Sequence, residues 1–225
     1  MIQDPTDRYI AAILTRCTIA GKEILDIGCG KGRITRDLAR HAARVVAIDP
    51  DPAALRAARH SIPSERVSFL PPAALRSLPT ASFDLAFYTL SLHHIPAQEM
   101  TDSLRTTAGL LRQDGFLVII EPGDGGSLTE AKERFGAGSG DERSAREAAV
   151  RAMHALDGWS VGETLEFTVL FRFDDERDFF DSLFPDRQRR PSPFIRQVEA
   201  FLHRHRTADG IVLDAGRRLN VLYRR

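Results

Sequence analysis

The chain has 225 residues, of which 31 are Lys or Arg and 31 are Asp or Glu, so its formal net charge at pH 7 is zero. A balanced charge creates no global field that would attract nucleic acid or an anionic membrane. The two cysteines, Cys17 and Cys29, have neither metal-ligand nor C-x-x-C spacing, which argues against a disulfide framework, a zinc site and a redox dithiol. Without an 18-residue apolar run or a secretory signal pattern, we expect a cytoplasmic protein.

Short apolar runs alternate with helical patterns over the first 122 residues, which is typical of repeated β–α units. An N-terminal helix comes first, with Ile10, Ile13 and Leu14 on its apolar face. The residues around Val45–Ile48 are continuously apolar, as in a parallel strand covered on both faces. Because crossover connections are right-handed, we predict a doubly wound, mostly parallel α/β sheet. Its expected strands are 23–27, 44–49, 67–70, 83–88 and 115–120.

The pattern changes after Pro122. Two glycine-rich segments flank Leu128–Phe135, and apolar residues from Ala145 to Leu156 then recur at helical spacing. From Val161 to Phe173 the period becomes two, which predicts a half-exposed strand suited to a sheet edge. Two amphipathic helices and a last strand are expected at 179–184, 194–202 and 218–223. The glycine-rich segments also suggest that residues 123–160 form a mobile cover over an acceptor pocket.

The segment Glu23–Gly32 predicts a buried strand, a glycine-rich turn and the start of a helix. Three of its residues lack a Cβ, so the backbone can turn sharply and a ligand can lie against it: Gly28, Gly30 and Gly32. The N–H groups of the following helix favour an anionic ligand group. The sequence therefore predicts a small-molecule cofactor at this turn. A dinucleotide fingerprint would need a glycine at position 33, where this chain has Arg33.

Asp49 closes the second expected strand. A carboxylate at this place can accept hydrogen bonds from both hydroxyls of a ribose, which indicates a nucleoside cofactor without choosing between NAD and S-adenosylmethionine. The alternative is that Asp49 caps the following helix, although Asp51, directly before Pro52, could serve as that cap instead.

Three motifs together resemble the class I S-adenosylmethionine-dependent methyltransferases. The string E-x-L-D-x-G-C-G-x-G at Glu23–Gly32 resembles the family's first motif, Phe83–Ile95 resembles the fourth motif in its non-nucleic-acid form, and Leu110–Ile120 resembles the entry to the fifth strand. The resemblance covers residues 20–122, the expected cofactor-binding core. It implies a single domain, residues 1–225, with a seven-stranded Rossmann-like sheet. Residues 123–210 would then add helices and an edge strand that cover a small-molecule substrate.

The same resemblance implies roles for individual residues. Asp26 and the three glycines of the turn would shape the pocket for the methionine part of S-adenosylmethionine, and Asp49 would hold the ribose. Tyr88 would line the pocket by the amino group through its backbone carbonyl. The family commonly has G-D-A after the third strand, but this chain has Pro71-Pro72-Ala73. Adenine would therefore be recognised by backbone groups near Ala73 and by apolar packing.

His93 and His94 follow the fourth expected strand. Methyl transfer from a sulfonium needs a base only when the acceptor arrives protonated. Because adjacent residues on a helix do not share a face, we expect at most one of the two rings to point into the site. His93 is the candidate base or substrate contact. The alternative is a histidine at the start of a helix, packed at the rim of the cofactor site.

Two other functions stay open at this point. A nicotinamide-dependent oxidoreductase is disfavoured by Arg33 and by the lack of a Tyr-x-x-x-Lys pair after the fourth strand. A non-catalytic protein that binds S-adenosylmethionine or S-adenosylhomocysteine remains possible, since methyltransferase sites need no unique catalytic residue. The chain lacks the [DNS]-P-P-[YF] motif of amino-directed nucleic-acid methyltransferases and the acid-rich metal ligands of catechol-type enzymes. We therefore expect neither a nucleic-acid substrate nor a metal; the acceptor and the oligomeric state are left open.

Overall fold

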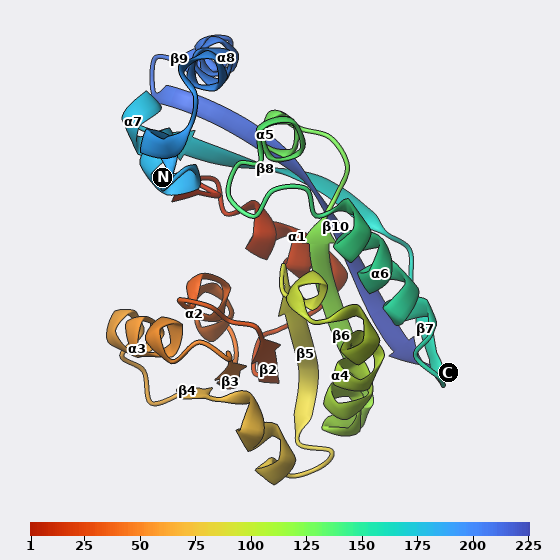
Figure 1. The fold of residues 1–225 in the computed structure, drawn as a ribbon. Coiled ribbons are helices and arrows are strands. Elements are labelled where there is room, and N and C mark those ends of the chain that lie inside the picture. The colour runs from red at the N-terminus through yellow and green to blue at the C-terminus, as the bar shows by residue number, and fades with distance from the viewer. The chain divides into compact units, whose positions relative to one another are not determined.

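A computed structural model describes residues 1–225, which fold as two compact units. The core unit contains residues 10–121, 144–165 and 218–225. The accessory unit contains residues 1–9, 122–143 and 166–217. Figure 1 gives the course of the chain through both. None of the helices combines the length and hydropathy that a membrane span requires.

The core unit is built on parallel strands in the order β6-β5-β2-β3-β4. The C-terminal strand β10 (Gly210–Arg224) is the other neighbour of β6. The prediction of parallel β–α units is confirmed, and the ends of β2 and β4 agree with those expected. β6 begins four residues before Gly115, and its register with β5 shifts between Phe83 and Leu85. The bounds are Glu23–Ile27 for β2, Arg44–Ile48 for β3, Val67–Leu70 for β4, Phe83–Thr89 for β5 and Leu111–Pro122 for β6.

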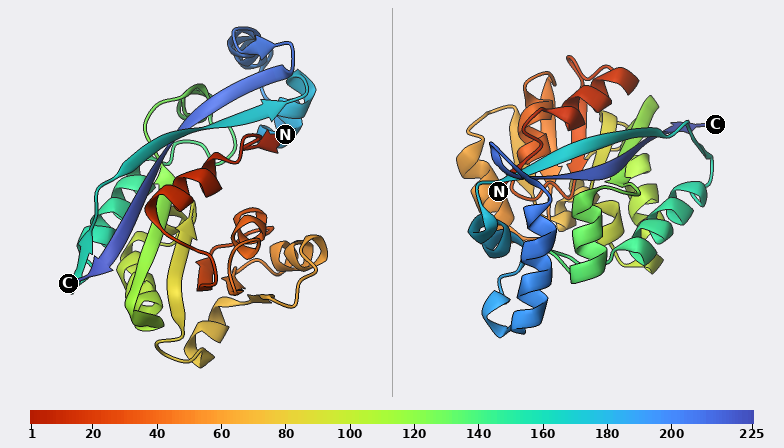
Figure 2. Two further views of the ribbon diagram at one scale, coloured as in Figure 1. Left: turned by 180° about the vertical axis from the view of Figure 1, so that it is seen from behind. Right: turned by 90° about the horizontal axis from the view of Figure 1, so that it is seen from above.

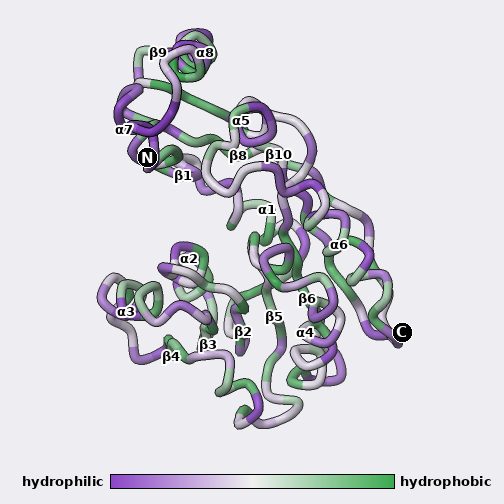
Figure 3. The backbone as a smooth tube through the Cα atoms, in the orientation of Figure 1, coloured by the Kyte–Doolittle hydropathy of each residue, from purple (hydrophilic) through white to green (hydrophobic).

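Helices cover both faces of these strands. Val46 and Ile48 belong to a buried cluster with α4 and α6, whereas Ala47 packs with Leu55 and Ala58 of α3 on the other face. Burial on both sides explains the continuous apolar runs of the strands, seen as hydrophobic colouring in Figure 3. The helices are α1 (Arg8–Arg16), α2 (Arg33–Ala39), α3 (Pro52–Ser61), α4 (Ala97–Gly109) and α6 (Arg143–His154), with the short 3₁₀ helices η1 (Pro72–Ser77) and η2 (Leu92–His94).

Helix α1 buries a different face from the one expected. Ile13 is fully buried, but Leu14 is 47% exposed. The buried positions are Tyr9, Ala12 and Ile13, which lie three and four residues apart and so share one side of the helix. The apolar side chain of Leu14 falls outside that stripe.

The accessory unit contains the strand order β1-β8-β10, with β9 paired to β10. The views of Figure 2 show the long strands β8 and β10 side by side. The predicted alternation is confirmed, because Phe167, Val169, Phe171 and Phe173 are buried on one face of β8. Its strands are β1 (Ile2–Gln3), β8 (Leu165–Phe173), β9 (Arg206–Thr207) and β10 (Gly210–Arg224), and its helices are α5 (Ser127–Phe135), α7 (Glu176–Leu183), η3 (Arg187–Arg189) and α8 (Ser192–His203).

Two details of the strands after Pro122 and at the N-terminus differ from the expectation. Strand β8 is not the outermost strand, because Ile2 of β1 pairs with Arg172 beyond it. A two-residue strand has no recognisable period, so the sequence pattern did not reveal it. The expected strand from Val161 is also divided, since β7 (Trp159–Val161) ends before β8 begins. The α/β class is confirmed, but there are ten strands rather than the predicted seven, because three strands of two or three residues add to the seven longer ones.

The segment 123–160 is divided between the two units. The apolar face of α6, which includes Ala149, Ala152 and Met153, is buried in the core-unit cluster together with Leu117 and Ile119. Before it, Gly126 lies so close to β10 that an added Cβ would be 2.6 Å from the carbonyl oxygen of Asp214. Helix α6 is therefore a packed part of the core unit. A mobile cover stays a prediction for residues 123–143 only.

Candidate cofactor site

The predicted cofactor residues gather where the parallel strands of the core unit end. The chain runs from β2 outward to β3 and β4, and then returns to the other side of β2 as β5. This reversal between β2 and β5 is a topological switch point, where the loops after the two strands turn in opposite directions and leave a crevice. The glycine-rich turn follows β2, Asp49 follows β3 and η2 follows β5.

The glycine-rich turn needs glycine for two different reasons. All three glycines have positive φ, +78° at Gly28, +54° at Gly30 and +83° at Gly32. A Cβ on Gly28 would lie 2.3 Å from the Cβ of Ser91, whose hydroxyl donates a hydrogen bond of 2.6 Å to the carbonyl of Ile27. Above Gly30 a Cβ would meet no atom within 4 Å. Gly28 thus permits close packing of the turn after β5, whereas Gly30 leaves open space against the backbone.

Asp49 connects the end of β3 to this turn. Its Oδ2 accepts a hydrogen bond of 2.7 Å from the Gly30 N–H, and its Oδ1 accepts one of 2.8 Å from the Asp51 N–H. Asp51 is the N-cap of α3, accepting from the Ala53 N–H at 2.8 Å. The capping alternative therefore belongs to Asp51. Each carboxylate oxygen of Asp49 can accept a second hydrogen bond, so the ribose role is compatible with this geometry and stays a prediction.

Asp26 is buried beneath the glycine-rich turn, with 1% of its surface exposed. Its Oδ2 accepts a hydrogen bond of 2.7 Å from the Thr35 hydroxyl on α2. Burial raises the pKa of Asp26 to about 6; the Thr35 hydrogen bond lowers it in part, and the charge of Asp49 raises it. The carboxyl group therefore ties β2 to α2, which fixes the course of the turn between them. Its contact with the methionine part of a cofactor stays a prediction.

The side chain of Tyr88 is packed against α4. It is fully buried, and its hydroxyl forms hydrogen bonds of 2.8 Å with Ser103 and Thr107 on α4. Burial raises the pKa of this hydroxyl to about 12. The ring is part of the core, so only the backbone of Tyr88 is left for the predicted contact with the amino group.

The residues that follow Tyr88 have two unusual features. The buried Oγ1 of Thr89 has no hydrogen-bond partner. Leu90 has φ +55°, a left-handed conformation that is uncommon outside glycine, and its N–H donates to the Ile120 carbonyl at 2.7 Å. An orphaned hydroxyl and a strained residue are features that cluster at ligand sites, and both lie at the carboxyl end of β5.

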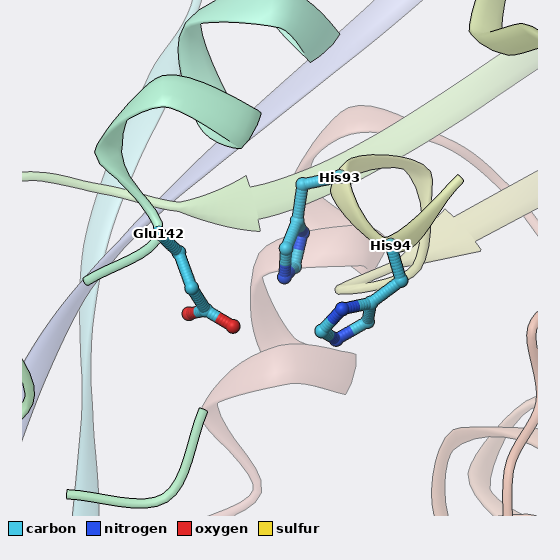
Figure 4. Close-up of side chains that lie close together, drawn as sticks. All are labelled: His93, His94 and Glu142. Atoms are coloured by element: carbon cyan, nitrogen blue, oxygen red, sulfur yellow. The ribbon is translucent and has the colours of Figure 1, made fainter. Parts of the chain in front are cut away.

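The two histidines of η2 occupy different environments (Figure 4). His93 is 6% exposed, and its Nδ1 lies 2.5 Å from Oε2 of the buried Glu121. His94 is exposed. The rings nevertheless contact each other, with centroids 4.1 Å apart, because η2 is a single tight turn rather than an α-helix. Glu142, also labelled in Figure 4, belongs to the accessory unit, where its Oε2 lies 2.8 Å from Lys132 Nζ.

The sequence analysis missed Glu121. This residue is 3% exposed and lies near the end of β6, and its Oε1 accepts a hydrogen bond of 3.2 Å from the Leu92 N–H. The sequence does contain a signal for this residue, because Glu121 directly follows the apolar run Phe116–Ile120. A carboxylate at the end of a buried parallel strand needs a hydrogen-bonding or charged partner.

The segment Pro71–Ala73, which we expect to contact adenine, has no acidic side chain. Ala73 lies on η1, which is exposed or half-buried throughout, and the Ala74 N–H donates to the Pro71 carbonyl at 3.0 Å. Recognition through backbone groups near Ala73 stays a prediction.

Neither cysteine is activated as a nucleophile. Burial raises the pKa of Cys17 to about 12. The pKa of Cys29, inside the glycine-rich turn, is raised by burial and then by the charges of Asp26 and Asp49. A thiolate is the reactive form of cysteine, and a raised pKa disfavours it.

Comparisons with known proteins agree with this geometry. A family model described as a methyltransferase domain matches residues 25–119. The ubiquinone biosynthesis O-methyltransferase of Xanthomonas euvesicatoria is 34% identical over 113 residues, which are 48% of this chain and 46% of that protein. The chain thus spans about half the length of the curated relatives it matches.

Solved structures extend the likeness of the fold over the whole chain. A candidate type II methyltransferase of Anaeromyxobacter dehalogenans has a TM-score of 0.67 at 16% identity, covering 100% of this chain and 98% of that one. A candidate methyltransferase of Bacillus halodurans has a TM-score of 0.62 at 14% identity, covering 95% and 97%. These structures share the Rossmann-like α/β fold. Residues 25–119 thus match the methyltransferase-domain family, and the solved structures add the likeness of the fold.

Proposed function

We propose that this protein transfers a methyl group from S-adenosylmethionine to a small-molecule acceptor. The observation that carries the proposal is the joint arrangement of the glycine-rich turn and Asp49. The carboxylate is bonded to the Gly30 N–H at 2.7 Å, and the space above Gly30 is open. This arrangement lies at a topological switch point, inside the part of the chain that matches the methyltransferase domain.

The residues present fit such a cofactor. The open space at Gly30 suits the methionine part, and Asp49 is 8% exposed with acceptor capacity left for a ribose. The backbone of Tyr88 would face the amino group, and backbone groups near Ala73 would face adenine. When bound, S-adenosylmethionine supplies a methyl group activated by its sulfonium. The task of the chain is then to orient the acceptor and exclude water.

The acceptor class that we favour is a hydroxyl group. The support is the 34% identity to the ubiquinone biosynthesis O-methyltransferase over 113 residues. A hydroxyl acceptor arrives protonated near neutral pH, and His93, on the turn after β5, is the side chain that we propose receives its proton.

Turnover against a panel of acceptors tests the proposal. Purified protein is incubated with S-adenosylmethionine and with phenols, alcohols, amines and thiols in turn, and S-adenosylhomocysteine and methylated product are quantified by mass spectrometry. We expect both products in equal amounts with at least one hydroxyl acceptor. Binding of S-adenosylhomocysteine without turnover on the whole panel would instead favour the non-catalytic binding protein. Reduction of NAD by a hydroxyl substrate would favour the oxidoreductase.

A further inference from the structure

We propose that Arg217 is a carboxylate-binding residue of the accessory unit, and that the acceptor of the methyl group is a small molecule that carries a carboxylate. The first part concerns the accessory unit alone and can be tested without methyl transfer. The second part rests on the proposed function. Both follow from a buried guanidinium that no acidic side chain neutralises.

Arg217 interrupts an apolar face of β10. The side chains of Ile211, Leu213 and Ala215 alternate along this strand and are at most 2% exposed. Arg217 is the next residue on the same face and is 6% exposed. Arginine is rarely buried to this extent unless it is paired, because removing a charge from water is costly. A side chain that only filled the face would be apolar.

The polar partners of the guanidinium are all neutral. Its Nε donates a hydrogen bond of 2.6 Å to the Tyr9 hydroxyl, and its Nη1 donates one of 2.7 Å to the Gly216 carbonyl. The Cζ atom is 5.9 Å from the centroid of the Tyr9 ring and 5.4 Å from that of Phe171. These rings attract the cation but carry no net charge. No acidic side chain forms an ion pair with Arg217.

Part of the guanidinium is left to bind a ligand. A guanidinium has five N–H groups, and the hydrogen bonds to Tyr9 and Gly216 use two of them, so three have no partner. The Nη2 atom makes no hydrogen bond, but unlike the enclosed Nε of Arg172 it is not cut off from solvent. A small opening therefore leads to a charged group with free donors, which is what an anion requires.

A carboxylate suits this position better than a bulkier anion. The guanidinium is planar and can donate two parallel hydrogen bonds to the two oxygens of a carboxylate. The aromatic rings of Tyr9 and Phe171 lie close to it, and the residue is only 6% exposed, so the approach is narrow. A flat carboxylate can enter such a space more easily than a tetrahedral phosphate.

The backbone beside Arg217 leads directly from the end of β6. Gly123, which follows the last residue of β6, donates from its N–H to the Gly216 carbonyl at 2.9 Å. A Cβ on Gly123 would be 2.9 Å from the backbone nitrogen of Arg217, so the two segments are in close contact. Open α/β sheets bind their ligands beyond the carboxyl ends of the parallel strands. We therefore assign the carboxylate to the acceptor.

A structural cation is the competing explanation. Arg217 could simply join Tyr9 to β10 through its hydrogen bond and the neighbouring rings. The two explanations differ in the response to anions, since a structural guanidinium would not distinguish a carboxylate from a neutral group of the same shape.

The first experiment needs no methyl transfer. Acetate and benzoate are the probes, and acetamide and benzamide are their neutral analogues. The Nε–H signal of Arg217 is followed by ¹H–¹⁵N NMR in the parent, with Arg217→Lys used for assignment. We expect a saturable shift with at least one carboxylate and none with its amide. An unchanged signal, or an equal response to the amide, would overturn the proposal without any variant having to fold.

Variants then locate the binding. The broadening of the probe's own ¹H signals measures its affinity, which should fall roughly tenfold or more in Arg217→Gln. The exposed Arg196→Gln on α8 should match the parent. Equal losses in both variants would show only non-specific attraction to positive charge. Tighter binding of inorganic phosphate than of either carboxylate would overturn the choice of a carboxylate.

The second experiment compares hydroxyl acceptors that differ only in having a carboxylate or its amide. We expect the parent to favour the carboxylate roughly tenfold or more in kcat/KM, and Arg217→Gln to lose most of this preference. Affinity for S-adenosylhomocysteine should stay within about twofold. A parent without the preference would overturn the assignment to the acceptor. If Arg217→Gln instead lost affinity for S-adenosylhomocysteine, the carboxylate would be that of the cofactor, which would also overturn it.

Failure of the proposed function has a different signature. A parent that binds acetate or benzoate at Arg217 but methylates no acceptor would refute methyl transfer and leave the carboxylate site in place.

Discussion

Asp26 is the most deeply buried acid of the core unit, and its environment gives it an unusual dependence on pH. Its ordinary pKa of 3.8 is raised to about 6 in the folded chain, chiefly by burial. The folded protein therefore binds a proton between these two values that the unfolded protein releases. The stability that Asp26 provides is full below about pH 3.8 and is lost as the pH rises through about 6.

Asp26→Asn tests this directly. Asparagine does not titrate, and its Oδ1 can still accept from the Thr35 hydroxyl. Relative to the parent, we expect the variant to gain free energy of unfolding as the pH is raised from about 4 to about 7, by roughly 2–3 kcal/mol. Urea denaturation at the two pH values provides the measurement. A difference between the two proteins that does not change with pH would show that Asp26 titrates normally.

The neighbouring acids Asp49 and Asp51 allow a matched comparison. We expect Asp49→Ala to weaken binding of S-adenosylhomocysteine at least tenfold, since a hydrogen bond to a charged acceptor contributes about 1.5–3 kcal/mol. Asp51→Ala should lose about 1 kcal/mol of stability through its helix cap and bind within twofold of the parent. Calorimetric titration and urea denaturation measure the two effects. An Asp49 variant with parental affinity would exclude the ribose role.

Single residues could be predicted from the sequence where the backbone conformation requires a particular residue type. A sharp turn at the three glycines was predicted and all three have positive φ, and Pro52 is in the first turn of α3 as predicted. The contact partners of a side chain were harder to predict from the sequence. Glu121 meets His93 across 28 residues of sequence, and only the register of β5 and β6 brings them together.

Among the elements, the turn after β2 determines how closely the chain and a cofactor can approach. Its first glycine packs against Ser91, whereas the second has open space. The two positions should therefore separate folding from binding, although both are glycines with positive φ.

We expect Gly28→Ala to destabilise the free protein by several kcal/mol, because its Cβ would be 2.3 Å from that of Ser91. Gly30→Ala should cost only the left-handed backbone, about 1–2 kcal/mol, but should lose most of its affinity for S-adenosylhomocysteine. Thermal denaturation and calorimetric titration of the two variants provide the test. A Gly28→Ala variant as stable as the parent, or a Gly30→Ala variant with parental affinity, would show that the cofactor does not bind at this turn.

Helix α6 and the segment before it should differ in hydrogen exchange. Because the apolar face of α6 is buried in the core unit, we expect slow exchange over 145–154 with or without ligand. If residues 123–143 cover the acceptor, they should become protected when S-adenosylhomocysteine and an acceptor analogue are added. Exchange followed by mass spectrometry distinguishes the two segments. Fast exchange in α6 that slows when ligand is added would instead support the mobile cover first predicted for residues 123–160.

The strand ends show which strands can be predicted from sequence patterns. The parallel strands β2 and β4 were predicted with their ends, although only β2 is buried along most of its length and β4 is mostly half-buried. Strand β10 was recognised only from Arg218, although it begins at Gly210. Its first half alternates buried and half-buried positions and includes Asp214 and Arg217, so it does not look apolar in sequence.

At the scale of the whole molecule, the fold class was predictable but the division of the chain was not. Local periods identify helices and strands, whereas the grouping of residues 122–143 with 166–217 depends on long-range pairing. The acceptor molecule is harder still to predict, because the relatives share only about half their length with this chain.

The central claim is that the core unit binds S-adenosylmethionine and its product rather than a nicotinamide dinucleotide. Calorimetric titration of the whole chain with S-adenosylhomocysteine, and separately with NAD, tests it most directly. We expect one S-adenosylhomocysteine bound per chain and no measurable heat with NAD. Binding of NAD in the absence of any binding of S-adenosylhomocysteine would contradict the account.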